Sequence, residues 1–345
     1  MKSADERDTI FARMTYSRGS QNYRDYYSRN PGKQELDDHL RSMPDICEEG
    51  TQVYDPLNSP LAVANFRFLS DIRHLVSGET ALPQVPCDAG EMSAKLRSLA
   101  RYYGADLVGI SKLRKDHFYS HRGRPGSEYG KEIHPSHPFA IVIGARMDMK
   151  VIDRAPGLPV LVESSLSYVK TAVTGMLLSY YLRELGYSAR NHMDGNYLLV
   201  ANRVAMDAGL GEFGRCGMLV TPDFGPAVRF SVVTTDLPLI ADGPSEFGVR
   251  EFCRICRNCA LLCPANALSL GDSAPDWKVD PEKCYEKWRQ FGSDCSICIS
   301  ACPLSRGLDH DELEKMKSPE GRKELLSAFR DRFGNRGNSR SPEWI

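Results

Sequence analysis

The sequence has neither an excess of charge of one sign nor a long hydrophobic run. Lysine and arginine number 44 and aspartate and glutamate 45, so the net charge is -1 and the chain as a whole lacks the basic character typical of nucleic-acid-binding domains. Its most apolar helical stretch, residues 171–182, lies between Lys170 and Arg183 and is far shorter than the roughly 20 residues that a membrane helix needs. We therefore expect no membrane span and no nucleic-acid partner.

The N-terminus also lacks a hydrophobic signal core and a twin-arginine pair. We expect a cytoplasmic protein, or a mature form whose leader has been removed. A hydrophobic content of 41% and a charged content of 26% are those of an ordinary folded protein, which excludes wholesale disorder.

The hydrophobic pattern predicts an α+β core between two less regular ends. The core should contain a helix ending near Gly104, strands at 106–110, 139–145 and 228–239, a long helix over 162–186 and a second helix over 197–209. The N-terminal arm reads as polar and irregular, apart from a short helix at 33–42. The expected division is an arm (1–90), a core (91–245), a cysteine-rich module (246–308) and a C-terminal helix with its tail (309–345).

The cysteines carry the clearest chemical signal. Eleven are present, and eight lie between positions 253 and 302 at short gaps that suit metal ligation better than disulfides. The first group matches C-x2-C-x2-C-x3-C-P, the bacterial ferredoxin pattern, in which the fourth cysteine ligates the other cluster. The second group has a stretched first gap. The predicted ligands are Cys253, Cys256, Cys259 and Cys302 for one 4Fe–4S cluster, and Cys263, Cys284, Cys295 and Cys298 for the other.

A pair of zinc sites is the alternative interpretation, but zinc sites lack the paired C-x3-C-P endings. The remaining cysteines, Cys47, Cys87 and Cys216, lie outside the pattern and are expected to be ordinary thiols. Two clusters form an electron conduit, and the α+β core must then hold whatever receives the electrons.

Two other patterns are weaker. The run GLGEFG from Gly209 to Gly214 matches a dinucleotide fingerprint, but it follows a predicted helix instead of a strand, so we expect a backbone turn that approaches a cofactor closely. On the long helix, Ser165, Tyr168, Ala172, Gly175 and Ser179 share a face opposite the stripe Leu166, Val169, Val173, Met176, Leu177 and Tyr180. Small neighbours around Tyr168 would leave room for a bulky ligand; close packing against another backbone is the alternative.

Nearly the whole chain resembles the catalytic subunit of reductive dehalogenases. The segments that carry the resemblance are RYYGADLVGI, AGLGEFGRCGMLVTPDFGPAVRF and KCYEKWRQFGSDCSICISACP, together with YRDYYSRNP in the arm. The resemblance implies a nitroreductase-like core that binds a base-off corrinoid (cobalamin-type) and a ferredoxin-like module with two 4Fe–4S clusters. The central block is shared in outline with epoxyqueuosine reductase, a tRNA-modifying enzyme.

The resemblance also implies roles for individual residues. Tyr168 takes the place of the family's proton donor, and Arg229 that of the basic residue that stabilises its phenolate. The family's pocket asparagine has no clean counterpart, and Asp194 or Asn196 could stand in. No D-x-H-x-x-G motif is present, so no histidine is expected on cobalt. Corrinoid contacts are expected in the glycine-rich block, at Gly209, Gly211, Gly214, Arg215, Gly217, Thr221 and Pro222.

The implied activity is reductive cleavage of the carbon–halogen bond of a small organohalide, with Tyr168 as proton donor. Arg229 should lower the pKa of Tyr168 if the two lie within about 4–6 Å. Electrons would come from reduced ferredoxin, flavodoxin or a reductase. The alternatives are another corrinoid and iron–sulfur reductase, such as an epoxyqueuosine reductase acting on tRNA, and a non-catalytic electron-transfer protein.

Overall fold

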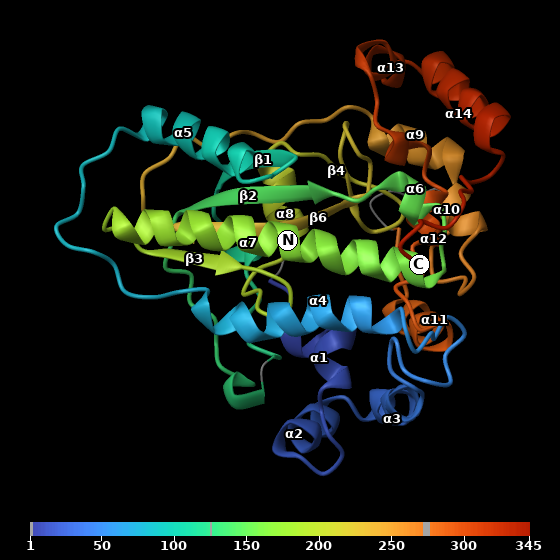
Figure 1. Cartoon of the computed structure of the whole chain (residues 1–345), viewed down its shortest axis with the longest axis horizontal. Coiled ribbons are helices and arrows are strands. Elements are labelled where there is room, and N and C mark those ends of the chain that lie inside the picture. Colours follow the sequence, from blue (N-terminus) through green and yellow to red (C-terminus); the bar gives the residue numbers. More distant parts are fainter. Residues whose placement is uncertain (1–2, 125, 272–276) are drawn as a thin grey trace.

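The computed structural model describes residues 3–124, 126–271 and 277–345, and its centre is a four-stranded sheet (Figure 1). The strands are ordered β1–β2–β6–β3, and each is antiparallel to its neighbours. The three strands predicted from the sequence are confirmed to within a few residues, whereas β3 was not expected. The bounds are β1 (Leu107–Lys112), β2 (Phe139–Arg146), β3 (Ala189–His192) and β6 (Val228–Thr235).

Helices cover both faces of this sheet. On one face, α5 (Ala89–Tyr102) and α7 (Leu158–Glu184) enclose a core in which Leu178 and Leu182 pack with Ile141 and Ile143. On the other face, α8 (Ala201–Asp207) packs against residues such as Val142 and Val232. Because helices cover both faces of the sheet, nearly every residue of the two central strands, β2 and β6, is buried.

The long helix α7 begins at Leu158, earlier than predicted, because Pro159 suits a first helical turn. Its predicted stop at Gly186 is confirmed. Gly186 has a φ of +85°, and a Cβ atom there would lie 2.6 Å from Cα of Gln84. Only glycine therefore fits the turn that closes α7 against the preceding loop.

The expectation that the small-residue face of α7 leaves room for a ligand is wrong for most of its length. A Cβ atom on Gly175 would lie 2.3 Å from Asn191 Oδ1, and Asn65 donates a 3.0 Å hydrogen bond from Nδ2 to Ser165 Oγ. The face therefore packs closely on β3 and on the arm. The opposite stripe, by contrast, is partly exposed at Leu166, Val173, Leu177 and Tyr180.

The arm is mostly helical, so its predicted irregularity is also wrong. The hydrophobic pattern did not reveal the helices because the core of the arm is built from tyrosine side chains instead of aliphatic ones. Tyr16, Tyr23, Tyr26 and Tyr27 form this buried cluster. Beside them, Arg13 makes a buried ion pair with Asp37. The arm helices are α1 (Ile10–Met14), α2 (Gln21–Arg29), α3 (Gln34–Ser42, as predicted) and α4 (Ser59–Ile72).

The cysteine-rich module and the tail pack together at one end of the molecule, away from β3 (Figure 1). The tail contains two helices where a single one was predicted. The helices are α9 (Val249–Cys256), α10 (Asn258–Leu261), α11 (Pro281–Phe291), α12 (Ile297–Ser300), α13 (His310–Met316) and α14 (Pro319–Phe333). The arm reaches this module, since Glu282 of α11 accepts hydrogen bonds from Arg13 (2.8 Å) and Lys33 (2.6 Å).

Short elements complete the chain: α6 (Met149–Ile152), β4 (Glu212–Phe213), β5 (Leu219–Val220) and six 3-10 turns, η1 (Glu6–Asp8), η2 (Pro31–Lys33), η3 (Arg73–Leu75), η4 (Lys115–His117), η5 (Gly126–Glu128) and η6 (Pro303–Arg306). Across the described ranges, no helix combines the length and the hydropathy needed to cross a bilayer.

Candidate active site

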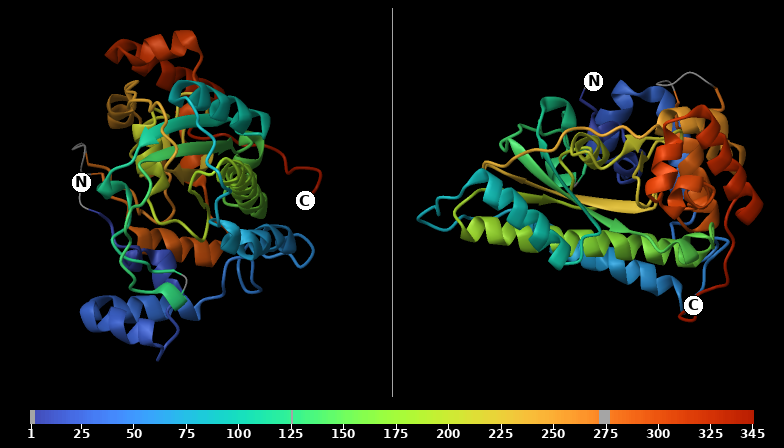
Figure 2. Two further views of the ribbon diagram at one scale, coloured as in Figure 1. Left: turned by 90° about the vertical axis from the view of Figure 1, so that its left-hand side faces the viewer. Right: turned by 90° about the horizontal axis from the view of Figure 1, so that it is seen from above.

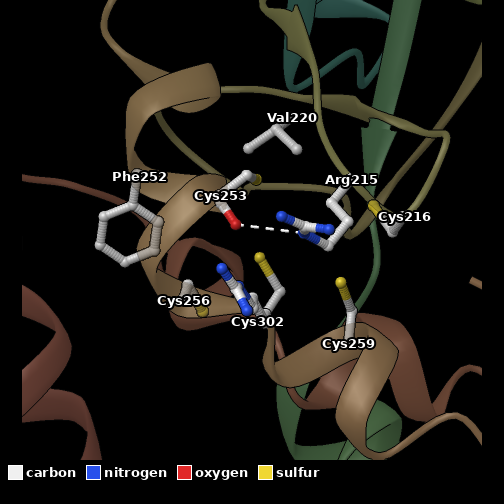
Figure 3. Close-up of a pocket in the computed structure, with 9 residues that line it drawn as sticks. Arg215, Cys216, Val220, Phe252, Cys253, Cys256, Cys259 and Cys302 are labelled. Carbon is white, nitrogen blue, oxygen red and sulfur yellow. Dashed lines mark hydrogen bonds between the residues drawn. The ribbon is translucent and has the colours of Figure 1, made fainter. Parts of the chain in front are cut away.

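Four of the predicted ligand cysteines surround one cavity (Figure 3). Cys253 and Cys256 come from α9, Cys259 from the following α10, and Cys302 from the end of α12. The left-handed backbone of Arg257, at φ +58°, turns the chain between the first two helices. Cys302 thus joins three cysteines that precede it by more than forty residues, which is the grouping that crossed ligation requires.

Local structure fixes the start of α9. The carboxylate of Glu212, in β4, accepts hydrogen bonds from the backbone N–H groups of Phe247, Gly248 and Val249 at 2.5, 3.0 and 3.3 Å. The N–H groups of Gly248 and Val249 are among the donors that a helix N-terminus leaves without an internal partner. The glycine-rich block therefore anchors the helix that carries Cys253 and Cys256.

The other four predicted ligands are also neighbours. Cys263 follows α10 and Cys284 lies on α11. Cys295 lies two residues before α12, and Cys298 lies within it. The charges of Cys263 and Cys284 act on both Cys295 and Cys298. Cys295 and Ser296 have left-handed backbones, at φ +59° and +51°, which bends the chain into this group.

The chemistry of both groups fits iron–sulfur clusters. Burial raises the pKa of Cys253 and Cys295 to about 12 and that of Cys284 to about 11. Thiols held this way ionise at neutral pH only when positive charge, such as that of iron, compensates for the lost water. Among the described residues, no three cysteine, histidine or acidic side chains come close enough together to hold a single metal ion.

Cys216 and Arg215 line the first cavity as well (Figure 3). The Arg215 side chain is buried and donates hydrogen bonds to the carbonyl oxygens of Cys253 (3.1 Å), Ser269 (2.7 Å) and Gly271 (2.8 Å). Its guanidinium also lies 4.5 Å from the ring centroid of Trp277. Arg215 therefore ties the cysteine helix to the following loop, an arrangement that no sequence pattern indicated.

The glycines of the central block are explained by close backbone packing. A Cβ atom on Gly209 would lie 2.6 Å from the Gly243 carbonyl oxygen, and one on Gly211 would lie 2.2 Å from that of Val220. Gly214 and Gly217 are crowded instead by side chains, with a Cβ atom 2.7 Å from a Val220 methyl group and 2.5 Å from a Val279 methyl group. These positions admit no side chain, whatever cofactor lies beside them.

Thr221 and Pro222 lie in the turn that follows β5. The Thr221 hydroxyl accepts a 3.1 Å hydrogen bond from Phe224 N and donates one to the Gly225 carbonyl at 3.2 Å. The Pro222 carbonyl accepts from Leu308 N at 2.9 Å, which ties the core to the end of the cysteine-rich module.

The structure brings Tyr168 and Arg229 together. Tyr168 lies on α7 and Arg229 at the start of β6, with the guanidinium carbon 5.3 Å from the centre of the phenol ring. Among the described residues, no protein group hydrogen-bonds to the Tyr168 hydroxyl. The side chain therefore has its ring against a cation and a hydroxyl that no described protein group engages.

Arg229 is held from two further directions. Its Nε and Nη2 atoms donate hydrogen bonds of 3.1 and 2.8 Å to Ser164 Oγ, and Nη2 lies 3.2 Å from Asp294 Oδ2. The side chain of Asp294 is buried, and its Oδ1 has no partner among the described residues. Asp294 directly precedes Cys295, so one short segment reaches both a predicted cluster ligand and the arginine beside Tyr168.

Arg229 lowers the pKa of Tyr168, as predicted, but its charge does not decide the net shift. Burial raises the pKa of Tyr168 more strongly than the charge of Arg229 lowers it, so the net shift is upward. Loss of water penalises the phenolate, and a single cation at this distance offsets only part of that cost.

A polar wall continues from Tyr168. Burial raises the pKa of Asp194, while Arg124 and Arg229 oppose the shift, and the charge of Asp194 acts on Tyr168. Asn196 is occupied elsewhere, because its Oδ1 accepts from Arg122 (3.2 Å) and Arg190 (2.9 Å). Of the two proposed stand-ins for the pocket asparagine, Asp194 is therefore the one that influences the tyrosine.

Two of the eight histidines are buried and bound into the fold. His192 is buried, with Nε2 3.1 Å from Thr234 Oγ1 and Nδ1 accepting from Leu198 N. His117 is also buried and lies 2.8 Å from Asp207.

The sequence is similar to an iron–sulfur domain family and to several reductive dehalogenases. The profile of the 4Fe-4S dicluster domain family matches residues 252–305. Tetrachloroethene reductive dehalogenase of Desulfitobacterium hafniense is 36% identical over 268 residues, which is 63% of this chain and 48% of that protein. The enzyme of the same name from Sulfurospirillum multivorans is 29% identical over 264 residues, covering 65% and 52%. The chain thus spans about half the length of the curated relatives it matches.

Solved structures agree. One, titled "Reductive dehalogenase structure suggests a mechanism for B12-dependent dehalogenation", matches 86% of this chain and 46% of its own, with a TM-score of 0.71 and 27% identity. The catabolic reductive dehalogenase NpRdhA in complex with 3-bromo-4-hydroxybenzoic acid matches 97% of this chain and 46% of its own, with a TM-score of 0.74 and 26% identity.

A second kind of relative is matched in sequence. Epoxyqueuosine reductase of Lactococcus garvieae is 30% identical over 163 residues, 42% of this chain and 45% of that enzyme. The mixed helix-and-sheet chain described here is thus a homologue of the reductive dehalogenases that carries a 4Fe-4S dicluster domain.

Proposed function

We propose that this chain is a corrinoid- and iron–sulfur-dependent reductase that removes halide from a small organohalide. The observation that carries the proposal is the junction at Asp294, where the segment that leads into Cys295 contacts Arg229, which lies against Tyr168. Groups that deliver electrons and a group that can deliver a proton thereby meet in one buried region.

The proposed ligand sets are those predicted from the sequence, with Cys253, Cys256, Cys259 and Cys302 around one cluster and the other four around the second. The core would be of the nitroreductase type, with the corrinoid beside the glycine-rich block from Gly209 to Pro222. When bound, the two clusters and the corrinoid supply the electrons and the centre at which the carbon–halogen bond breaks.

The chain's own residues supply the proton and its control. The raised pKa of Tyr168 keeps the phenol protonated at neutral pH, and the hydroxyl donates its proton to the carbon that has lost halide. Arg229, held by Ser164 and Asp294, stabilises the phenolate that results. The protein thus holds the acid and the cation that stabilises its conjugate base.

Halide release tests the proposal. Anaerobically reconstituted protein, with a corrinoid, a chemical reductant and a brominated or chlorinated phenol, should release halide and form the dehalogenated product in equal amounts. Reduced ferredoxin, flavodoxin or a reductase would then be tried as physiological donors. Release that is unchanged when the protein is left out would refute the proposal.

An epoxyqueuosine reductase-type activity on tRNA is the second candidate, favoured by the 30% identity to the enzyme from Lactococcus garvieae. Formation of queuosine from epoxyqueuosine-containing tRNA, without halide release, would support it. Iron–sulfur protein that binds no corrinoid would instead indicate a non-catalytic electron carrier.

A further inference from the structure

Large apolar side chains are exposed along one side of α7. Leu166, Val173, Leu177 and Tyr180 are 36%, 38%, 46% and 45% exposed, and their spacing of seven, four and three residues keeps them on one stripe. A helix of 27 residues is about 40 Å long, so the stripe extends over much of the molecule.

Helix α4 continues the apolar surface. It lies beside α7 and runs in the same direction, since Ala62 packs near Leu161 at one end and Leu69 with Ala172 further along. Its exposed large apolar residues are Leu61 (40%), Val63 (49%) and Phe68 (44%), with Leu75 (38%) just beyond its end. Leu61 and Phe68 are seven residues apart and share one side of the helix, whereas Val63 lies on another. Both helices form the outer layer of the molecule on this side (Figures 1 and 2). The α4–α7 face is defined here as Leu61, Phe68, Leu75, Leu166, Val173, Leu177 and Tyr180.

Seven large apolar side chains on this face are each more than a third exposed. Monomeric proteins rarely expose contiguous apolar patches larger than a few hundred Å², and a larger patch marks an interface. The a/d-like spacing on α7 is the spacing by which helices pack side by side. The surface therefore suits another helix pair better than a small ligand.

The charges on the same stripe suggest which helices pair. Lys170 and Glu184 are both exposed, and they lie seven residues before and seven residues after Leu177. Within the described part of the chain, neither forms an ion pair. An antiparallel copy of α7 that crosses at Leu177 would place each Lys170 opposite a Glu184.

We infer that the α4–α7 face binds the same face of a second copy of this chain, with the two α7 helices antiparallel about a two-fold axis at Leu177. In this arrangement Leu177 meets the partner's Leu177, Val173 lies near the partner's Tyr180, and Lys170 faces the partner's Glu184. A two-fold interface is self-complementary, and here one stripe supplies both the apolar centre and two opposite charges at its ends. The inference does not depend on the proposed activity.

The test is the molar mass of the whole, cluster-loaded chain by sedimentation velocity across micromolar concentrations. The expected result is a reversible dimer. Leu177→Lys should give a monomer with unchanged iron content, because it places two ammonium groups at the axis. Ile240→Lys is the matched control, since Ile240 is 58% exposed in the loop beyond β6, off this face, and the change should leave the dimer intact.

Charge reversal tests the register separately. Lys170→Glu and Glu184→Lys should each raise the dimer dissociation constant by about tenfold, because each change turns two ion pairs into two repulsive contacts. The double variant should restore the wild-type value. A monomeric wild type, a dimer indifferent to Leu177→Lys, or a double variant as weak as the single ones would overturn the inference.

Discussion

At the scale of single residues, the Tyr168 hydroxyl is the group on which the proposed chemistry depends most. Tyr168→Phe retains the ring against Arg229 and removes only the proton donor. General acid catalysis is typically worth about 10²–10⁴-fold, so turnover of a confirmed halogenated substrate should fall within that range. Iron content and bound corrinoid, measured on the same sample, should not change. A loss below tenfold would assign the proton to water or to Asp194.

Arg229 should affect the pH dependence of turnover as well as its size. An acid must be protonated to act, so turnover falls as pH rises through the pKa of Tyr168. Because Arg229 lowers that pKa, Arg229→Met should raise it and move the alkaline limb of the kcat profile to higher pH. Arg229→Lys should be less damaging, since charge remains although the contacts to both Ser164 and Asp294 cannot all be kept. A limb that moves to lower pH would contradict this role.

Asp294 should act through Arg229 and not through the cluster. Asp294→Asn keeps the size of the side chain but removes the negative charge beside the guanidinium, so kcat should fall about tenfold, the loss expected for one charged hydrogen bond, while KM stays near wild type. Cluster absorbance should stay at the wild-type level. Asp331→Asn, on an exposed turn of α14, is the matched control. Loss of cluster absorbance in Asp294→Asn would show a structural role instead.

Residues of the site differ in how far sequence alone reveals them. The cluster cysteines are predicted from two local spacing patterns together with the ferredoxin rule that the fourth cysteine ligates the other cluster. Tyr168 and Arg229 are predicted from resemblance to a family. Ser164 and Asp294 could not, because they meet Arg229 only when α7, β6 and the segment before α12 pack together. Arg215 was assigned to the corrinoid from its neighbours, whereas its observed hydrogen bonds go to the carbonyls of the cysteine-rich module.

At the scale of elements, the contact between α7 and β3 sets how closely the helix lies on the sheet. Glycine to alanine normally stabilises a helix interior by about 1 kcal/mol. At Gly175 the added methyl would overlap Asn191 Oδ1, so Gly175→Ala should instead destabilise by about 1–3 kcal/mol. Thermal unfolding followed by circular dichroism shows whether the substitution lowers or raises the melting temperature. Ser98→Ala, on the exposed side of α5, is the control and should be nearly neutral.

The crossover between the two halves of the cysteine-rich module makes a second prediction at this scale. Cys302 lies in the cavity of Cys253, Cys256 and Cys259, so Cys302→Ser should remove about four of roughly eight iron atoms and leave the other cluster's electron paramagnetic resonance signal in place. Cys87→Ser is the matched control. Loss of the signal from the Cys298 cluster would show that the ligand sets are not crossed.

Elements were predictable where periodicity was strong. The strands and α7 were found because both faces of the sheet are buried and Gly186 marks an obvious stop. α4 was missed because its exposed side is as apolar as its buried side, so it shows no amphipathic contrast. The arm was misread because its core uses tyrosine hydroxyls that bond to carboxylates, such as Tyr27 to Asp37 at 2.7 Å, and looks polar in sequence.

At the scale of the whole molecule, the corrinoid should bind without a histidine on cobalt. Both ring nitrogens of His192 are engaged within the fold, and its burial holds its pKa well below the usual value. Electron paramagnetic resonance of the Co(II) state should therefore show no nitrogen hyperfine splitting. Splitting that disappears in His192→Gln would reverse this conclusion.

The packing of the arm on α11 should affect how well the iron–sulfur site at Cys284 tolerates oxygen. The ring of Phe11 meets that of Tyr285 edge-on at 5.8 Å and lies 5.7 Å from that of Trp288. Tyr285 directly follows Cys284, and Trp288 is one helical turn further on. Arg13 and Lys33 hold Glu282 on the same helix. The first forty residues thus cover the outer side of a helix that carries a proposed ligand. A protease cut that releases them would expose that ligand to dissolved oxygen, and the cluster at Cys284 would bleach before the one at Cys253.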